Sequence, residues 1–133
     1  MTFPNILLIE DNEMNRQVVR DMLAVAGLQI DEASNGPEGL RMLQQTRYDL
    51  LLVDLRMPGM SGFDVIREVR SGRNETTGAA IIVISGEYGP RLRCDCLEAG
   101  AADLLTKPLA MQDLFESIGA VLAKRSKAGE LIS

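Results

Sequence analysis

Four short hydrophobic runs along the chain each end in polar or charged side chains. Apolar runs of this length, bounded by polar residues, are typical of strands that are buried on both faces of a parallel sheet. The runs and their polar ends are Ile6–Ile9 with Glu10 and Asp11, Leu50–Val53 with Asp54, Ala80–Ile84 with Ser85, and Leu104–Thr106 with Lys107 and Pro108. Because the carboxyl ends of parallel strands meet at one edge of a sheet, we expect these polar groups to lie close together.

Helical periods lie between the runs. The three clearest place hydrophobic side chains three or four residues apart, which is the spacing of one helix face. They comprise Val18, Met22, Val25 and Ala26 with Val19 and Leu23 alongside, then Phe63, Ile66, Val69 and Arg70, and last Met111, Leu114, Phe115, Ile118, Val121 and Leu122. The turn signals that go with the helices are Gly27 and Gly72 at the ends of the first and third, and Asn35-Gly36-Pro37 and Gly89-Pro90 at the starts of the second and fourth.

The resulting order is a strand followed by a helix, five times over. Strands that alternate with helices at this spacing require right-handed crossovers, so the sheet should be parallel with helices on both faces. We therefore predict an α/β fold of the flavodoxin-like (βα)5 kind, a doubly wound sandwich with a five-stranded parallel sheet in the order 2-1-3-4-5. Its switch point lies between strands one and three, the strands that Asp11 and Asp54 follow.

The polar ends together predict an acidic metal pocket. Glu10 and Asp11 would meet Asp54 across the switch point, with the Ser85 hydroxyl and the Lys107 ammonium beside them. Mg²⁺ prefers oxygen ligands and shares its shell with carboxylates, water and phosphoryl groups, and a lysine supplies a point charge to phosphate. This set of groups favours phosphoryl transfer to Asp54.

Four motifs in this order resemble the receiver domain of two-component response regulators, and the resemblance covers about residues 5 to 125. The motifs are I-L-L-I-E-D-N-E-M-N-R at 6–16, L-L-V-D-L-R-M-P-G-M-S-G at 51–62, I-I-V-I-S-G at 81–86 and D-L-L-T-K-P at 103–108. The opening E-D-N-x-x-N-R is more similar to the receivers attached to hybrid histidine kinases than to those of common transcriptional regulators.

The resemblance implies a role for each site residue. Asp54 accepts a phosphoryl group, and Asp11, Asp54 and the backbone carbonyl of Arg56 bind Mg²⁺ directly, with Glu10 acting through a water. Lys107 pairs first with Asp54 and then with the phosphoryl group, and its bond to Pro108 is expected to be cis. The Ser85 hydroxyl turns toward the phosphoryl group, which switches the loop at 86–90 and the fourth helix. Such a domain is a phosphoacceptor that assists its own phosphorylation and dephosphorylation, and it is not a separate enzyme.

The resemblance also implies partners. A sensor histidine kinase or a histidine phosphotransfer domain is the expected donor, and a weak homodimer remains open. In the family the donor docks on the first helix and on the loop after the fifth strand, where this chain has an apolar rim formed by Met14, Asn15, Val18, Pro108 and Leu109. Arg56 and Glu87, each two residues beyond a site residue, are expected to pair across the mouth of the pocket.

Other interpretations remain for several of these residues. Asp11 alone could cap the first helix, Ser85 could be a turn serine, and Lys107 could be a solvated lysine. One position departs from the family, because Leu104 stands where receivers commonly carry an aromatic switch residue. A pseudo-receiver would keep the fold without the chemistry. A haloacid-dehalogenase-type phosphatase would need an Asp at the position of Arg56.

Length and charge restrict the functional class. The 133 residues, 46% of them hydrophobic, predict one domain at 1–125 with a short tail at 126–133, and they leave no room for a DNA-binding module. A net charge of −5 argues against binding to nucleic acid or to an anionic membrane. The chain has no apolar stretch of membrane-spanning length and no signal-peptide pattern, so we expect a cytoplasmic protein.

The absence of histidine excludes two kinds of chemistry within this sequence. Ser-His-Asp and Cys-His catalysis both need an imidazole, and the chain contains none. Cys94 and Cys96 point to different faces of a helix and lack further partners, so a zinc site or a disulfide between them is not expected. The phosphohistidine donor must therefore belong to another protein or another domain.

Overall fold

The computed structural model describes residues 3–71 and 78–132, with side chains described as far as Lys124. Strands and helices alternate along the chain, as the hydrophobic pattern predicts. The strands are β1 (Ile6–Ile9), β2 (Ile30–Ala33), β3 (Leu50–Asp54), β4 (Ala80–Ser85) and β5 (Asp103–Thr106). The helices are α1 (Glu13–Val25), α2 (Gly36–Gln45), α3 (Gly62–Arg70), α4 (Pro90–Ala99) and α5 (Met111–Ile132).

The five strands form one parallel sheet in the order β2-β1-β3-β4-β5, which confirms the predicted topology. Its register aligns the carboxyl ends of the strands. Ile9 pairs with Val53, so that Glu10 and Asp54 follow matching positions on neighbouring strands. Ser85 pairs with Thr106, which places Lys107 just beyond it. The predicted convergence of the polar strand ends therefore follows from the register alone.

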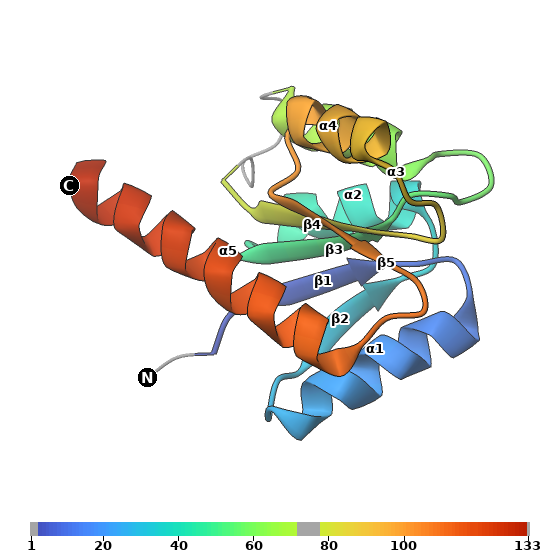
Figure 1. Ribbon diagram of the computed structural model, residues 1–133, viewed down its shortest axis with the longest axis horizontal. Helices are drawn as coiled ribbons and strands as arrows, with labels where there is room; N and C mark the ends of the chain where they lie inside the picture. The colour runs from blue at the N-terminus through green and yellow to red at the C-terminus, as the bar shows by residue number, and fades with distance from the viewer. Residues whose placement is uncertain (1–2, 72–77, 133) are drawn as a thin grey trace.

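Helices cover both faces of the sheet (Figure 1): α1 and α5 lie against one face, and α2, α3 and α4 lie against the other. Side chains that alternate along each strand enter the two hydrophobic layers in turn, so that Leu7 packs beneath α2 and α3 while Leu8 packs beneath α1 and α5. The three central strands are buried along nearly their whole length. Such burial explains why they read as continuous apolar runs in the sequence.

The apolar residues of α1 divide between the core and the surface. The residues of α1 that are buried are Val19 and Leu23, whereas Val18 and Val25 are exposed and Ala26 forms the C-cap. The spacing of Val18, Met22 and Val25 satisfies a helical period, but so does the neighbouring stripe, and periodicity cannot choose between two overlapping stripes. Met22 packs partly buried against the core, whereas Val18 remains at the surface and lines the pocket beside the site.

Local side-chain caps set several helix starts. Asn12 and Asn35 accept hydrogen bonds from the backbone of the first turns of α1 and α2, and Ser61 forms a capping box with Asp64 at the start of α3. The start of α4 at Pro90 matches the predicted turn signal. Helix α3 ends at Arg70, and the predicted stop at Gly72 lies outside the described residues.

The last helix extends farther than the predicted domain boundary. The boundary at residue 125 falls inside α5, whose backbone continues to Ile132 and projects past the sheet in Figure 1. Leu114, Ile118 and Val121 form the buried part of its predicted apolar stripe. Within residues 3–71 and 78–132, no helix combines the length and apolar character needed to cross a membrane.

Candidate phosphoacceptor site

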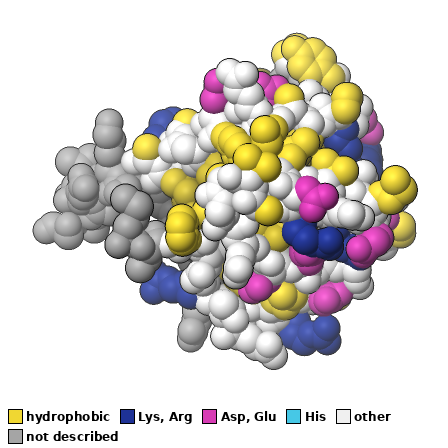
Figure 2. Space-filling model, turned by 90° about the horizontal axis from the view of Figure 1, so that it is seen from below, with side chains coloured by type: hydrophobic (Ala, Val, Ile, Leu, Met, Phe, Trp, Pro, Cys, Tyr) yellow, Lys and Arg dark blue, Asp and Glu magenta, His cyan; other side chains and the backbone are white. Residues whose placement is uncertain are grey.

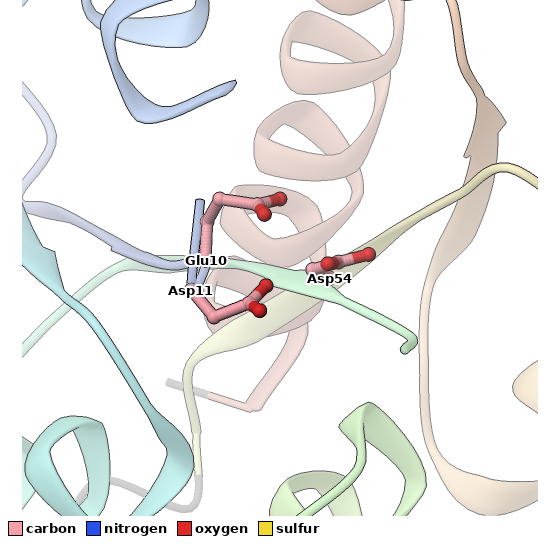
Figure 3. Close-up of side chains that lie close together, drawn as sticks. All are labelled: Glu10, Asp11 and Asp54. Atoms are coloured by element: carbon pink, nitrogen blue, oxygen red, sulfur yellow. The ribbon is translucent and has the colours of Figure 1, made fainter. Parts of the chain in front are cut away.

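Three carboxylates meet at the carboxyl edge of the sheet. Glu10 and Asp11 follow β1, Asp54 ends β3, and one oxygen from each lies within 4.8 Å of the others. Figure 3 shows the three side chains turning toward the same space. Glu10 is 3% exposed and Asp54 4% exposed, whereas Asp11 is open to solvent. The structure thus brings together the acidic residues predicted from the sequence.

Asp11 does not cap the first helix. The N-cap of α1 is Asn12, whose side-chain oxygen accepts a hydrogen bond from the Asn15 backbone at 3.0 Å. The capping requirement of α1 is therefore met by the next residue along the chain. This leaves the Asp11 carboxylate close to those of Glu10 and Asp54, where the like charges repel one another.

Glu10 is held in place by groups on three sides. Its Oε1 accepts from the Asn12 backbone at 3.2 Å and from the Asn15 side chain at 3.4 Å, and its Oε2 lies 3.4 Å from Lys107 Nζ. Burial raises the pKa of the Glu10 carboxyl above its ordinary value, and the negative charge of Asp54 raises it further. A carboxyl group in such surroundings favours a nearby cation.

Lys107 bridges the two buried carboxylates. Its Nζ lies 3.3 Å from Asp54 Oδ1 and 3.4 Å from Glu10 Oε2, and the side chain is mostly screened from solvent. The peptide bond between Lys107 and Pro108 is cis, as the resemblance implies. Lys107 is therefore a pocket residue, and the alternative of a freely solvated strand-end lysine is wrong.

Ser85 is fully buried at the end of β4. Its Oγ accepts a hydrogen bond from the Glu87 backbone at 2.9 Å, and its carbonyl accepts from the Lys107 backbone at 2.8 Å. The Ser85 hydroxyl thus stabilises the turn between β4 and α4. The same residue also contacts the backbone of the pocket residue Lys107, so Ser85 is both a turn residue and a neighbour of the site. Leu104, in the usual aromatic position, is buried against the core beneath α2, α3 and α4.

Arg56 and Glu87 pair across the loops that follow β3 and β4, as predicted. Arg56 Nε lies 2.6 Å from Glu87 Oε1, and Nη2 lies 3.0 Å from Oε2. The pair lowers the pKa of the Glu87 carboxyl through the hydrogen bonds from Arg56. Both side chains are exposed, so their mutual attraction is screened by water.

Sequence reasoning missed two residues that shape this site. Gly62 donates its backbone N–H to Leu55 at 2.9 Å, and a Cβ at this position would lie only 2.7 Å from the carbonyl oxygen of Asp54. Arg16 donates from Nη1 to the carbonyl oxygen of Glu10 at 2.7 Å. Both lie within quoted motifs, but a contact with a backbone atom leaves no hydropathy or charge pattern that could have revealed it.

A small pocket adjoins the site on the side of α1 and α5. Its lining comprises Glu10, Asn15, Val18, Val19, Ile84, Lys107, Pro108 and Leu109. Met14, beside it on α1, is 76% exposed. The face seen in Figure 2 carries hydrophobic side chains gathered near its centre, next to a group of charged ones. The predicted apolar rim therefore lies next to the acidic pocket.

Known proteins resemble this chain along most of its length. The family model of the response regulator receiver domain matches residues 6–119. The hybrid signal transduction histidine kinase F of Dictyostelium discoideum is 36% identical over 120 residues, which cover 88% of this chain and 11% of that protein. The cell cycle transcriptional regulator CtrA of Caulobacter vibrioides is 34% identical over 122 residues, which cover 92% of this chain and 51% of that protein.

Solved structures give the same result. The chemotaxis protein CheY4 of Vibrio cholerae superimposes with a TM-score of 0.83 at 28% identity, covering 90% of this chain and 99% of that one. The signal receiver domain of a histidine kinase from Syntrophus aciditrophicus gives a TM-score of 0.81 at 29% identity, covering 92% of each chain. The sheet order, the convergent strand ends and these matches agree, and the chain belongs to the response regulator receiver domain family of two-component systems.

Proposed function

We propose that this domain accepts a phosphoryl group from a phosphohistidine onto Asp54. The observation that carries the proposal is the position of the Asp54 carboxylate, which is buried at the end of β3 with the Lys107 ammonium 3.3 Å from Oδ1. A carboxylate oxygen of Asp54 attacks phosphorus while the bond from phosphorus to the imidazole nitrogen breaks. The electron pair of that bond returns to the imidazole, and the product is an aspartyl phosphate.

Lys107 and Ser85 can stabilise the negative charge of the phosphoryl group once it is bound to Asp54. Lys107 already lies between the two buried carboxylates, so its ammonium can pair with a phosphoryl oxygen after a small change of rotamer. The Ser85 hydroxyl accepts from the Glu87 backbone here, and it donates to a phosphoryl oxygen once it turns toward Asp54. These movements use groups that are already within the site.

The donor set fits Mg²⁺. Glu10, Asp11 and Asp54 supply hard oxygen ligands that crowd one another without a cation, and the oxygens lie close enough to share one ion. We propose that Asp11, Asp54 and the backbone carbonyl of Arg56 hold the ion directly and that Glu10 acts through a water. Bound there, Mg²⁺ neutralises negative charge on the transferring phosphoryl group.

The donor histidine lies outside this sequence, which contains no histidine. We propose that a histidine kinase or a histidine phosphotransfer domain presents it from a helix that docks against Val18, Pro108 and Leu109. Support comes from the apolar pocket that these residues form directly beside Glu10 and Lys107. A docked helix there would bring its phosphohistidine to the mouth of the acidic site.

We further propose that phosphorylation biases the β4–α4 region. When the Ser85 hydroxyl turns toward the phosphoryl group, the Glu87 backbone loses its 2.9 Å hydrogen bond. The helix that follows has no side-chain cap at Gly89, and Cys96 is its buried residue, with Leu92 and Ala99 partly buried against the core. A change at Ser85 can therefore shift the balance between two positions of this segment.

The direct test is incubation with Mg²⁺ and a small acyl phosphate, followed by intact mass measurement. We expect wild type to gain the mass of one phosphoryl group and Asp54→Ala to gain none. A pseudo-receiver would show no gain in either protein. A phosphatase of the haloacid dehalogenase type would turn over the acyl phosphate continuously, and an unmodified wild type that consumes no acyl phosphate would overturn the proposal.

A further inference from the structure

We infer that Arg16 is a positioning residue for the metal-binding carboxylates. It touches no reacting atom. Its Nη1 donates to the carbonyl oxygen of Glu10 at 2.7 Å, and its side chain is only 14% exposed although it carries a full charge. A largely screened guanidinium directed at a backbone carbonyl, one residue before a candidate metal ligand, restrains the orientation of that peptide.

The restrained peptide is the one that joins Glu10 to Asp11. The peptide before it, between Ile9 and Glu10, is also held, because the Glu10 backbone N–H donates to the Ala33 carbonyl of β2 at 3.1 Å. The Arg16 contact satisfies the carbonyl that follows, at a residue that water hardly reaches. Because the side chains of Glu10 and Asp11 leave the chain on either side of this peptide, fixing its plane restrains the directions in which both carboxylates point.

Arg16 is itself held by the surrounding structure. Its backbone N–H donates to the Asn12 carbonyl at 3.0 Å, its Nη2 pairs with Glu13, and its Nε lies 3.5 Å from Glu32. The Glu32 carboxylate is fixed in turn by two hydrogen bonds from Arg20, at 2.7 and 2.8 Å. The guanidinium therefore reaches the Glu10 carbonyl from a preset position, as a supporting group for a metal ligand must.

Arg20 offers a matched control in the same ion-pair cluster. It pairs with Glu13 and Glu32, as Arg16 does, but none of the hydrogen bonds and ion pairs described for Arg20 reaches Glu10. Removing Arg20 disturbs the tie between α1 and β2 without removing the contact with the Glu10 carbonyl. The two arginines thus separate a local positioning effect from a general loss of stability.

This inference rests on the proposed Mg²⁺ site, and it is tested by calorimetric titration of the phosphate-free protein with Mg²⁺. Arg16→Ala should raise the dissociation constant for Mg²⁺ about tenfold, at the lower end of the range for groups that orient a metal ligand. Arg16→Lys keeps a donor within reach of the carbonyl and should recover most of the affinity. Arg20→Ala should change the affinity by about twofold or less, because its described contacts are with Glu13 and Glu32 and leave the Arg16 contact with the Glu10 carbonyl in place.

A second readout separates affinity from folding. Each variant is unfolded in urea to compare stabilities, and its rate of phosphorylation by acyl phosphate is followed as Mg²⁺ is raised. We expect saturating Mg²⁺ to restore the rate of Arg16→Ala, because the catalytic groups remain. If Arg16→Ala does not fold, Arg16→Met retains the apolar stem without the donor and takes its place.

The possible outcomes separate a failure of the Arg16 role from a failure of the proposed Mg²⁺ site. Failure of wild type to bind Mg²⁺ would remove the metal site itself. Normal binding by wild type and an equal affinity in Arg16→Ala would overturn only the role of Arg16. Equal weakening in Arg16→Ala and Arg20→Ala would also overturn it, because the effect would then come from the shared ion pairs.

Discussion

Asp54 and Glu10 are acidic side chains that water hardly reaches, and such groups are costly to bury unless charged or polar partners compensate. Lys107 compensates both at once, since its ammonium lies 3.3 Å from Asp54 and 3.4 Å from Glu10. Removing the lysine would leave two neighbouring carboxylates without a cation, and Glu10 would keep only its hydrogen bonds from Asn12 and Asn15. At the scale of single residues, the site therefore depends on the Lys107 ammonium, which the two carboxylates share, as much as on Asp54 itself.

Tyr48 is a buried residue with a titratable hydroxyl, and it provides a pH prediction. Its hydroxyl donates to Asp31 Oδ2 at 2.6 Å. Burial, together with this hydrogen bond, raises the pKa of Tyr48 from 10.0 to about 12. The sequence has two tyrosines, so in Tyr88→Phe only Tyr48 remains. We expect its phenolate absorbance to appear with a midpoint near 12.

The shift also fixes the sign of a stability effect. The folded protein favours the neutral phenol, so this contribution is fully present below pH 10 and is lost as pH rises through about 12. Tyr48→Phe should therefore lose less unfolding free energy than wild type over that interval, as measured by urea unfolding. A phenol midpoint near 10 in the Tyr88→Phe protein would contradict the burial and hydrogen bond of Tyr48.

The site residues differ in how far the sequence could predict them. Glu10, Asp54 and Lys107 could be found because each follows a hydrophobic run, and parallel strands bring such ends together. Arg16 and Gly62 could not be found in this way. One contacts a backbone carbonyl and the other allows a close backbone approach, and both contacts exist only once the chain has folded.

At the scale of elements, the loops that follow two site strands are joined by an ion pair. Arg56 lies after β3 and Glu87 after β4, and two hydrogen bonds connect their side chains. Both side chains are exposed, so the ion pair is weak and the paired, closed arrangement of the loops is expected to exchange with an open one. We propose that the closed pair hinders the approach of the water that hydrolyses the aspartyl phosphate.

Arg56→Ala and Glu87→Ala should each accelerate autodephosphorylation by a factor of about two to three, consistent with the modest effect of an exposed pair. The double variant should be little faster than either single one, because each substitution already opens the pair. The loss of phosphoryl mass with time measures the rates. Multiplicative acceleration in the double variant would show that the two side chains act independently, and the closed pair would then have no role.

Helices and strands could be predicted from the sequence where their side chains are fully buried, and less well where burial is partial. The central strands β1, β3 and β4 match apolar runs because both their faces are covered. Edge strand β2 contains Asp31 and Glu32 and gives no such run. The helical period of α1 was predictable, but its spacing does not separate the buried Val19 and Leu23 from Val18 and Val25, which are apolar and remain at the surface. An exposed apolar stripe cannot be told from a core stripe by spacing alone.

At the scale of the whole molecule, we propose that a donor docks on the exposed apolar residues at the start of α1. Met14 and Val18 lie on α1 next to the pocket lined by Pro108 and Leu109. An apolar surface beside a charged pocket suits a transient interface, in which the apolar contact orients the partner and the pocket carries out the chemistry.

Met14→Asp should slow transfer from a phosphorylated histidine phosphotransfer domain by about tenfold, as expected for a charge placed at a central contact. Transfer from acyl phosphate should be nearly unchanged. Val25→Asp is a matched control, because Val25 is 70% exposed on the same helix but lies at its far end. If both substrates slow equally in Met14→Asp, the residue supports the pocket and does not dock the donor. Equal slowing in Val25→Asp would show a general effect of charge on α1.

The central claim is that Asp54 is the residue that carries the phosphoryl group. Borohydride reduction of an aspartyl phosphate converts that residue to homoserine, which marks its position permanently. We expect protein treated with Mg²⁺ and acyl phosphate, then reduced and digested, to contain homoserine at residue 54 and unmodified aspartate at residue 11. Homoserine at another acidic residue, or its absence from a protein that has gained phosphoryl mass, would contradict the account.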